Sequence, residues 1–118
     1  MLGPFRHSQT PEASMTEAVI IGLHPRSGKF EELAALVQQM VEQVRRHAGC
    51  LQAEILLAQD RNEIAIFQKW KDNDSFSDYL IWRSKQEQLD RVYEMCAIEP
   101  ELSSFTLAAP VESPQTAY

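Results

Sequence analysis

The sequence predicts an α+β domain in which strands and helical segments follow one another in the order βαββαβ. Three patterns predict it. Residues 29–48 carry apolar side chains at helical spacing. Residues 64–70 alternate in the period of a strand. Turn and cap residues at 71–75 then lead into a second helical stripe. A chain of 118 residues is expected to form a single domain with a small core.

The first half of the chain is predicted to contain a strand and a long helix. Residues 18–23, AVIIGL, form an apolar run with no polar face, which is typical of a strand buried on both sides. A turn at 24–28 ends this strand, and the apolar stripe over 29–48 predicts a helix with glutamates and glutamines on its other side. Gly49 is expected to stop the helix.

A β-hairpin is predicted next. Residues 51–58 alternate between two faces, and the polar loop 59–62 leads into the strand 64–70. Ile64, Ile66, Gln68 and Trp70 share one face of this second strand. Both strands are therefore expected in one antiparallel sheet.

Helical segments and a last strand complete the predicted order. Ser75, followed three residues later by Asp78, forms an acidic variant of a capping box and predicts a helix start. Ser84 is expected to restart a helix that Pro100 prevents from continuing. Residues 101–107, ELSSFTL, have the pattern of a short strand.

The predicted sheet has more apolar surface than one chain can cover. Right-handed crossovers place both helical segments on one side of the sheet, but residues 18–23 and 64–70 are apolar or aromatic on both faces. If a few hundred Å² of apolar sheet stayed exposed, the fold would lose several kcal/mol of hydrophobic stabilisation, at about 25 cal/mol per Å². The sequence therefore predicts a homodimer in which a partner sheet covers the second face.

Composition and charge exclude several classes of protein. A net charge of −6 argues against binding to a nucleic acid backbone. There is no run of about 18 apolar residues and no secretory signal pattern, so we expect a cytoplasmic protein that does not enter a membrane. Cys50 and Cys96 lack metal-site spacing and are expected to be reduced residues in or near the core.

Both ends of the chain are predicted to lie outside the domain. Residues 1–14 are polar, contain two prolines and show no period, so a disordered tail is expected, and Met15 is an alternative start. Residues 110–118 have a similar composition. The predicted domain is 15–109.

Tyr79 and Arg83 are the first candidates for chemistry. They lie one helical turn apart, so a phenol and a guanidinium can point at the same spot and stabilise a phenolate or enolate. Alternatively, Arg83 pairs with Asp78 or Glu87 on the surface and the Tyr79 hydroxyl lies at a rim.

His24, at the end of the first strand, is the candidate general base. Its position is expected to lie at the mouth of a helix–sheet cavity, and an ordinary histidine pKa near 6.5 suits proton abstraction from a phenol. The alternative is a surface histidine without a catalytic role.

Aromatic and polar strand residues are candidates for substrate binding. Trp70 and Trp82 offer flat surfaces for an aromatic ligand, or are core or interface residues. Glu54 and Gln68, like Gln52, interrupt apolar strands and either line a wet cavity or lie at an edge or interface.

The stretch from the strand at 64–70 into SFSDYLIWR at 75–83 resembles the antibiotic biosynthesis monooxygenase domains. The run VIIGLHPRSGKFEELAAL at 19–36 is similar to the opening strand, loop and first helix of that family, and AGCL at 48–51 stands where its second strand begins. The resemblance covers residues 17 to 109. It implies a ferredoxin-like fold with a four-stranded antiparallel sheet that pairs into a dimeric α/β barrel, with Trp70 beside the cavity.

The resemblance also implies an activity. It suggests a monooxygenase that needs no flavin, haem or metal and uses O₂ to oxidise a hydroxylated aromatic or quinol. His24 would then be the base, Tyr79 and Arg83 would hold the anion, and Trp70 would stack on the substrate. A dimeric ligand-binding module without catalysis is the alternative. Haem binding is disfavoured, since haem-binding relatives carry histidine where this chain has Tyr79.

Overall fold

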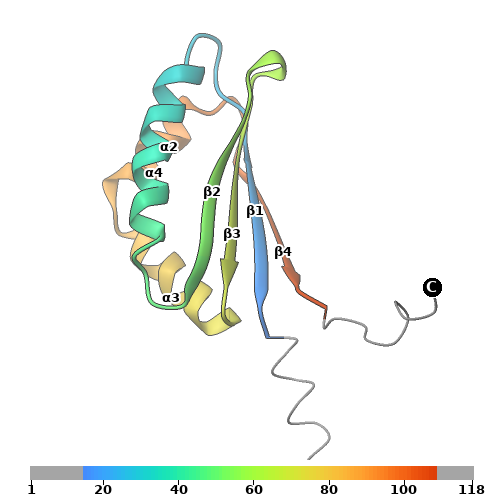
Figure 1. Ribbon diagram of the computed structural model, residues 1–118. Coiled ribbons are helices and arrows are strands. Elements are labelled where there is room, and N and C mark those ends of the chain that lie inside the picture. The colour runs from blue at the N-terminus through green and yellow to red at the C-terminus, as the bar shows by residue number, and fades with distance from the viewer. Residues whose placement is uncertain (1–14, 109–118) are drawn as a thin grey trace, which may run out of the picture.

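The computed structural model describes residues 15–108, which form one sheet and one helical layer (Figure 1). The tails predicted at 1–14 and 110–118 lie outside the described residues. The elements are β1 (Glu17–Leu23), α2 (Phe30–Val44), β2 (Cys50–Ala58), β3 (Glu63–Trp70), α3 (Asn73–Ser84), α4 (Glu87–Met95) and β4 (Glu101–Thr106), with a short 3₁₀ turn at Gln59–Arg61. The predicted order is confirmed, and its second helical segment consists of two helices.

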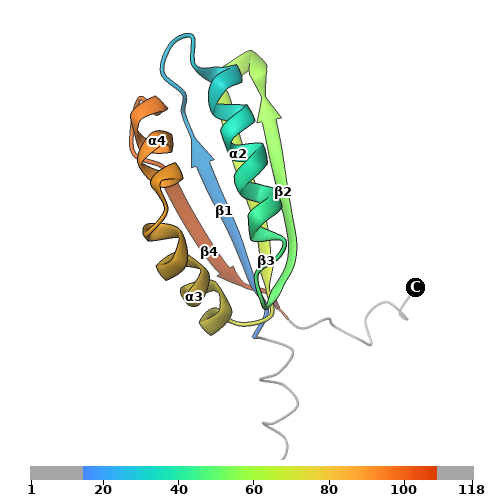
Figure 2. The same ribbon diagram turned by 90° about the vertical axis from the view of Figure 1, so that its left-hand side faces the viewer.

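The four strands form an antiparallel sheet in the order β2-β3-β1-β4. All three helices lie on one side of it (Figure 1). In the view of Figure 2, α2 lies on the β2 side of the layer, α3 and α4 lie on the β4 side, and β1 is visible between them. The predicted ferredoxin-like α+β fold is therefore confirmed. The dimeric barrel remains a prediction, because one chain is described.

The register of the strands decides which residues face the helices. Val19 pairs with Gln68, and Gln68 pairs with Ala53, and all three side chains are buried under the helices. In the next row, Ile20 pairs with Phe67 on the opposite side of the sheet. We call that opposite side the open face.

None of the helices in residues 15–108 covers the open face. Ile20 is 42% exposed there, and Leu56 and Phe105 are exposed by more than half. Burial on both sides, as predicted for residues 18–23, is therefore absent within one chain. The residues of β4, which is an edge strand, are exposed on both faces.

The long helix α2 ends earlier than its apolar pattern predicts. Its stripe is buried as expected at Leu33, Leu36, Val37, Met40, Val41 and Val44. Beyond Val44 the amides of Arg46 and His47 bond the carbonyls three residues back, so the chain tightens into turns. Gly49 then reverses the chain with φ of 89°, and a side chain there would collide with Ser75.

The two later helices begin at other residues than predicted. Asp72, not Ser75, caps α3, and its side chain accepts a hydrogen bond of 2.8 Å from the Ser75 amide. This bond lowers the pKa of the Asp72 carboxyl. The Ser84 hydroxyl donates to the Ile81 carbonyl, so it does not start the next helix, and α4 begins after Gln86.

Candidate functional site

A cavity of about 170 Å³ lies between the helices and the sheet. Its walls come from β1, β3 and β4 below and from all three helices above. Most of the lining is aliphatic and includes Ile21, Met40, Ile66, Leu89 and Val92. The polar groups of the lining belong to Tyr79, Arg83 and Tyr93. An apolar cavity with a few convergent polar groups is the usual form of a small-molecule site.

Arg83 is buried in the cavity wall and is held by neutral groups. The side chain is 3% exposed. Its Nε donates to the Tyr79 hydroxyl at 2.9 Å. Its Nη1 donates to the side-chain oxygens of Gln43 at 3.0 Å and Gln88 at 2.8 Å, and its Nη2 donates to the Met40 carbonyl at 3.3 Å. These bonds fix the guanidinium and leave its charge in place.

No carboxylate neutralises Arg83 among residues 15–108. The alternative pairing with Asp78 or Glu87 does not occur in this structure. The one buried carboxylate of the described chain, Glu17, accepts instead from the hydroxyls of Ser104 and Thr106. Buried charges are normally paired, so an unpaired cation in the wall of an apolar cavity is unusual and makes Arg83 the main candidate for a binding group.

Tyr79 is the second polar group of the cavity and is 5% exposed. Because its oxygen accepts from Arg83 Nε, its own O–H remains available as a donor. The Tyr79 ring stacks on Trp70 with 5.3 Å between ring centroids. The guanidinium carbon of Arg83 lies 4.8 Å from the centre of the Trp82 ring. Tyr79, Arg83, Trp70 and Trp82 therefore form one aromatic and cationic cluster.

Trp70 and Gln68 lie behind the cavity and not in its lining. Trp70 is fully buried, and its Nε1 donates to Gln68 Oε1 at 2.9 Å. The Nε2 group of Gln68 has no hydrogen-bond partner among the described residues. Both residues contribute by supporting the position of Tyr79.

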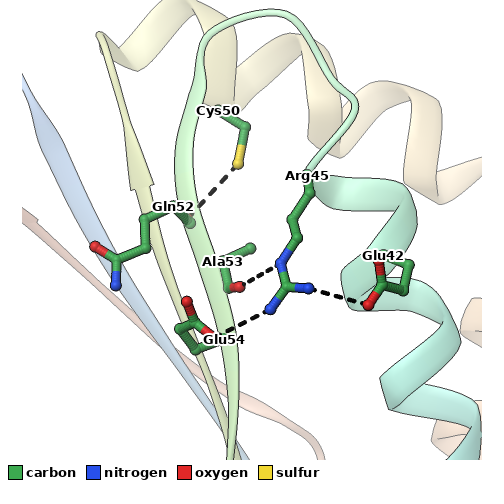
Figure 3. Close-up of polar contacts among 6 residues, drawn as sticks. All are labelled: Glu42, Arg45, Cys50, Gln52, Ala53 and Glu54. Atoms are coloured by element: carbon green, nitrogen blue, oxygen red, sulfur yellow. Dashed lines mark hydrogen bonds and ion pairs between the residues drawn. The ribbon is translucent and has the colours of Figure 1, made fainter.

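Glu54 lies apart from the cavity, in a polar contact between the end of α2 and strand β2 (Figure 3). Arg45 donates to Glu54 and to Glu42, at 3.0 Å in each case, and to the Ala53 carbonyl at 2.8 Å. The Gln52 side chain points away from Arg45 in this view. These bonds fasten the edge strand β2 to the helix.

Nearby, the thiol of Cys50 contacts the Gln52 carbonyl at 3.6 Å, and burial raises its pKa. Cys96 is buried, and burial raises the pKa of its thiol as well. Both cysteines are free, as the sequence predicts.

His24 does not lie at the cavity mouth, where the sequence places it. Its Nε2 is 3.3 Å from Glu101 Oε1, and Glu101 pairs with Gly22 on the open face. The charge of His24 is also one cause of the lowered pKa of Glu63, after the hydrogen bond and charge of Arg61. His24 follows the last residue of β1, and its contact with Glu101 of β4 holds the side chain away from the cavity.

Three residues of the site were not expected from the sequence. Gln43 and Gln88 hold Arg83, and His47 packs its ring edge against Tyr79 at 5.3 Å and beside Trp82 at 4.5 Å. Burial and the charge of Arg83 lower the pKa of His47. His47 lies beyond the end of α2, and no local pattern of the sequence assigns Gln43, Gln88 or His47 to the site.

Two kinds of feature are absent from the described chain. Residues 15–108 contain no group of three or more His, Cys, Asp or Glu side chains close enough to share a metal ion. None of the helices over the same residues has the length and apolar content to cross a bilayer.

The fold and the cavity define a ferredoxin-like α+β domain with a buried cation in the wall of an apolar cavity. The family model of the antibiotic biosynthesis monooxygenases matches residues 18–89, and the chain belongs to this family. Curated protein sequences give no match.

Solved structures share the fold at low sequence identity. A conserved protein from Methanosarcina mazei Go1 superimposes with a TM-score of 0.72 at 16% identity, covering 80% of this chain and 95% of its own. Rv0793 from Mycobacterium tuberculosis gives 0.66 at 21% identity, with 83% and 97% covered. SnoaB, a cofactor-independent oxygenase from Streptomyces nogalater, gives 0.69 at 15% identity, with 83% and 98% covered.

Proposed function

We propose that the protein is a cofactor-independent monooxygenase that oxidises a hydroxylated aromatic or quinol-type molecule in the cavity. The observation that carries this proposal is Arg83, which is buried in the cavity wall without a carboxylate partner among the described residues. Membership of the monooxygenase family supports the reaction type. The fold shared with the oxygenase SnoaB is consistent with it.

Arg83 and Tyr79 have the properties needed to hold the reactive anion. A phenol in water has a pKa near 10, and a buried cation lowers this pKa by favouring the phenolate. The O–H of Tyr79 is a second donor in the same cavity wall. Both groups are fixed before the ligand enters, so stabilising the anion costs little reorganisation.

A quinol supplies every electron that the reaction needs. Its anion gives one electron to O₂, and the two radicals then combine at a ring carbon. One oxygen atom stays on the ring, the other leaves as water, and the product is a hydroxyquinone. The four electrons taken up by O₂ come from the quinol, so no further reductant is required.

The cavity offers no general base among its described lining residues, which include no His, Asp, Glu or Lys. His24 faces the other side of the sheet. We therefore assign binding of the preformed anion to Arg83 and Tyr79, and we route no proton through His24. Trp70 and Trp82 keep these two groups in place.

The test is O₂ uptake with quinols in buffer containing a chelator, after subtraction of the rate without protein. Arg83→Met is expected to lower the rate roughly 100-fold, as is typical for loss of a donor to a developing anion. Tyr79→Phe is expected to cost about tenfold. Arg91→Met, an exposed arginine on α4 outside the cavity, is the matched control and should be unchanged. Equal rates in all four proteins would refute the proposal.

A ligand-binding module without catalysis is the second candidate. The absence of a base from the described lining favours it, because binding of an anion needs only the donors. Ligand binding without any O₂ uptake across a quinol series would establish this second function.

We also propose that the protein is a homodimer paired through the open face. Ile20, Leu56 and Phe105 leave an apolar surface there that one chain does not cover, and a surface of this kind is typical of an interface. Ile20→Lys should shift the mass in solution from dimer to monomer, whereas Ile81→Lys, the same change at a more exposed isoleucine on α3, should not. A monomeric wild type would refute the dimer.

A further inference from the structure

The size and charge of the cavity define a narrower class of ligand than the reaction type does. The cavity holds about 170 Å³. An engineered apolar cavity of about 150 Å³ in another protein holds one benzene molecule. One aromatic ring with small substituents therefore fills this space, and a fused three-ring skeleton exceeds it.

The donors of the cavity wall set the charge of the ligand. A guanidinium has five N–H groups, and Arg83 gives four hydrogen bonds to protein oxygens. One N–H on Nη2 remains, together with the O–H of Tyr79. Both residues line the cavity, so a ligand with an oxygen acceptor can bind them, and the charge of Arg83 favours an ionised acceptor.

The exposure of the lining sets the orientation of the ligand. Leu80, Tyr93 and Leu102 line the cavity and are between 38% and 48% exposed, so they form its mouth. Arg83 and Tyr79 are almost fully buried at the inner end. The ionised edge of the ring therefore enters first, and the opposite edge lies among the apolar side chains of the mouth.

We infer that the site selects a single aromatic ring carrying one ionised oxygen group, which for the proposed reaction means a monocyclic quinol bound as its monoanion. The naming of a quinol in this inference rests on the proposed function. The size and charge limits follow from the cavity itself.

Calorimetric titration of the full chain at neutral pH tests both limits with unreactive probes. Benzoate is a permanent one-ring anion, and benzamide has nearly the same shape without the charge. Benzoate should bind roughly 10- to 100-fold more tightly than benzamide, the range of a charge-assisted hydrogen bond. 9-Anthracenecarboxylate carries the same charge on three rings and should not bind.

Arg83→Met should remove the preference for benzoate, whereas Arg91→Met should keep it. Equal affinity for benzoate and benzamide would overturn the charge limit. Binding of 9-anthracenecarboxylate as tightly as benzoate would overturn the size limit. Because the wild type alone decides both comparisons, they do not depend on the folding of a variant.

Turnover separates this inference from the proposed function. If benzoate binds as expected but no monocyclic quinol supports O₂ uptake, the oxygenase function fails and the ligand class stands. If three-ring phenols support O₂ uptake and benzoate does not bind, the ligand class fails and the oxygenase function stands.

Discussion

The helical layer packs tightly over one half of the sheet and leaves a cavity over the other. Under α2, the side chains of Leu33, Val41 and Ala53 are at most 1% exposed. Near α3, α4 and β4, the cavity separates the helices from the sheet, and Leu102 remains 48% exposed. We call these regions the packed half and the cavity half.

The difference shows how stability and binding are divided within a small domain. The packed half buries the apolar surface that holds the chain together. The cavity half gives up some burial and holds an unpaired cation, a combination that stabilises a ligand and not the fold. Identical or matched substitutions should therefore have different effects in the two halves.

The largest effect is expected in the packed half from Leu33→Ala. Leu33 is fully buried in α2 and lies outside the cavity lining. Its truncation should lower the free energy of unfolding by about 2–5 kcal/mol, because the surrounding core cannot close over the space. Denaturant unfolding measures this. A loss below about 1 kcal/mol would show that the packed half is looser than described.

Arg83→Met should give the opposite result in the cavity half. Benzoate binding should fall roughly 10- to 100-fold, while the free energy of unfolding changes by about 1 kcal/mol or less. Replacing an unpaired buried charge by an apolar side chain removes its desolvation cost, and Gln43 and Gln88 are only partly buried and can turn to water. A large loss of stability would mean that Arg83 holds the fold and not a ligand.

Leu102→Ala makes the same chemical change as Leu33→Ala at the mouth of the cavity. Since Leu102 is already 48% exposed, its truncation should cost about 1 kcal/mol or less. The wider mouth should speed ligand exchange, which stopped-flow mixing or NMR line shapes can measure. If Leu102→Ala were as destabilising as Leu33→Ala, a partner chain burying this surface would be the explanation.

The sequence predicted the packed half better than the cavity half. The stripe of α2 is amphipathic, so its buried residues could be named from spacing alone. Tyr79 and Arg83 could also be paired, because their contact is local within one helix. Gln43 and Gln88 could not be assigned to Arg83, since their contact depends on how α2 and α4 pack across the cavity, and no local pattern encodes that.

His24 shows the same limit on the other side of the sheet. The sequence showed that His24 follows a strand. The side of the sheet on which His24 lies depends on the pairing of β1 with β4. The cap of α3 was ambiguous for a different reason. Asp72 and Ser75 are both good cap residues, and the choice between them follows from which amide the side chain reaches.

The smallest effect is expected from His47, which lies where α2 ends against α3 and faces Tyr79, Trp82 and Arg83. Burial, and then the charge of Arg83, lower its pKa from the ordinary value of 6.5. The unfolded chain therefore takes up this proton first as the pH falls through about 6.5. The contribution of His47 to the free energy of unfolding should be fully present above that pH. It should decline below that pH until His47 is protonated in the folded state as well.

His47→Gln should remove this part of the pH dependence without changing stability at pH 8, as measured by denaturant unfolding between pH 5 and pH 8. In the Arg83→Met background the contribution of His47 should shrink but persist, because burial is the larger cause of its shift. A His47 contribution that increased stability as the pH fell would require an acidic partner. None of the groups that contact its ring in the described chain is acidic, so that sign would contradict the packing of α2 against α3.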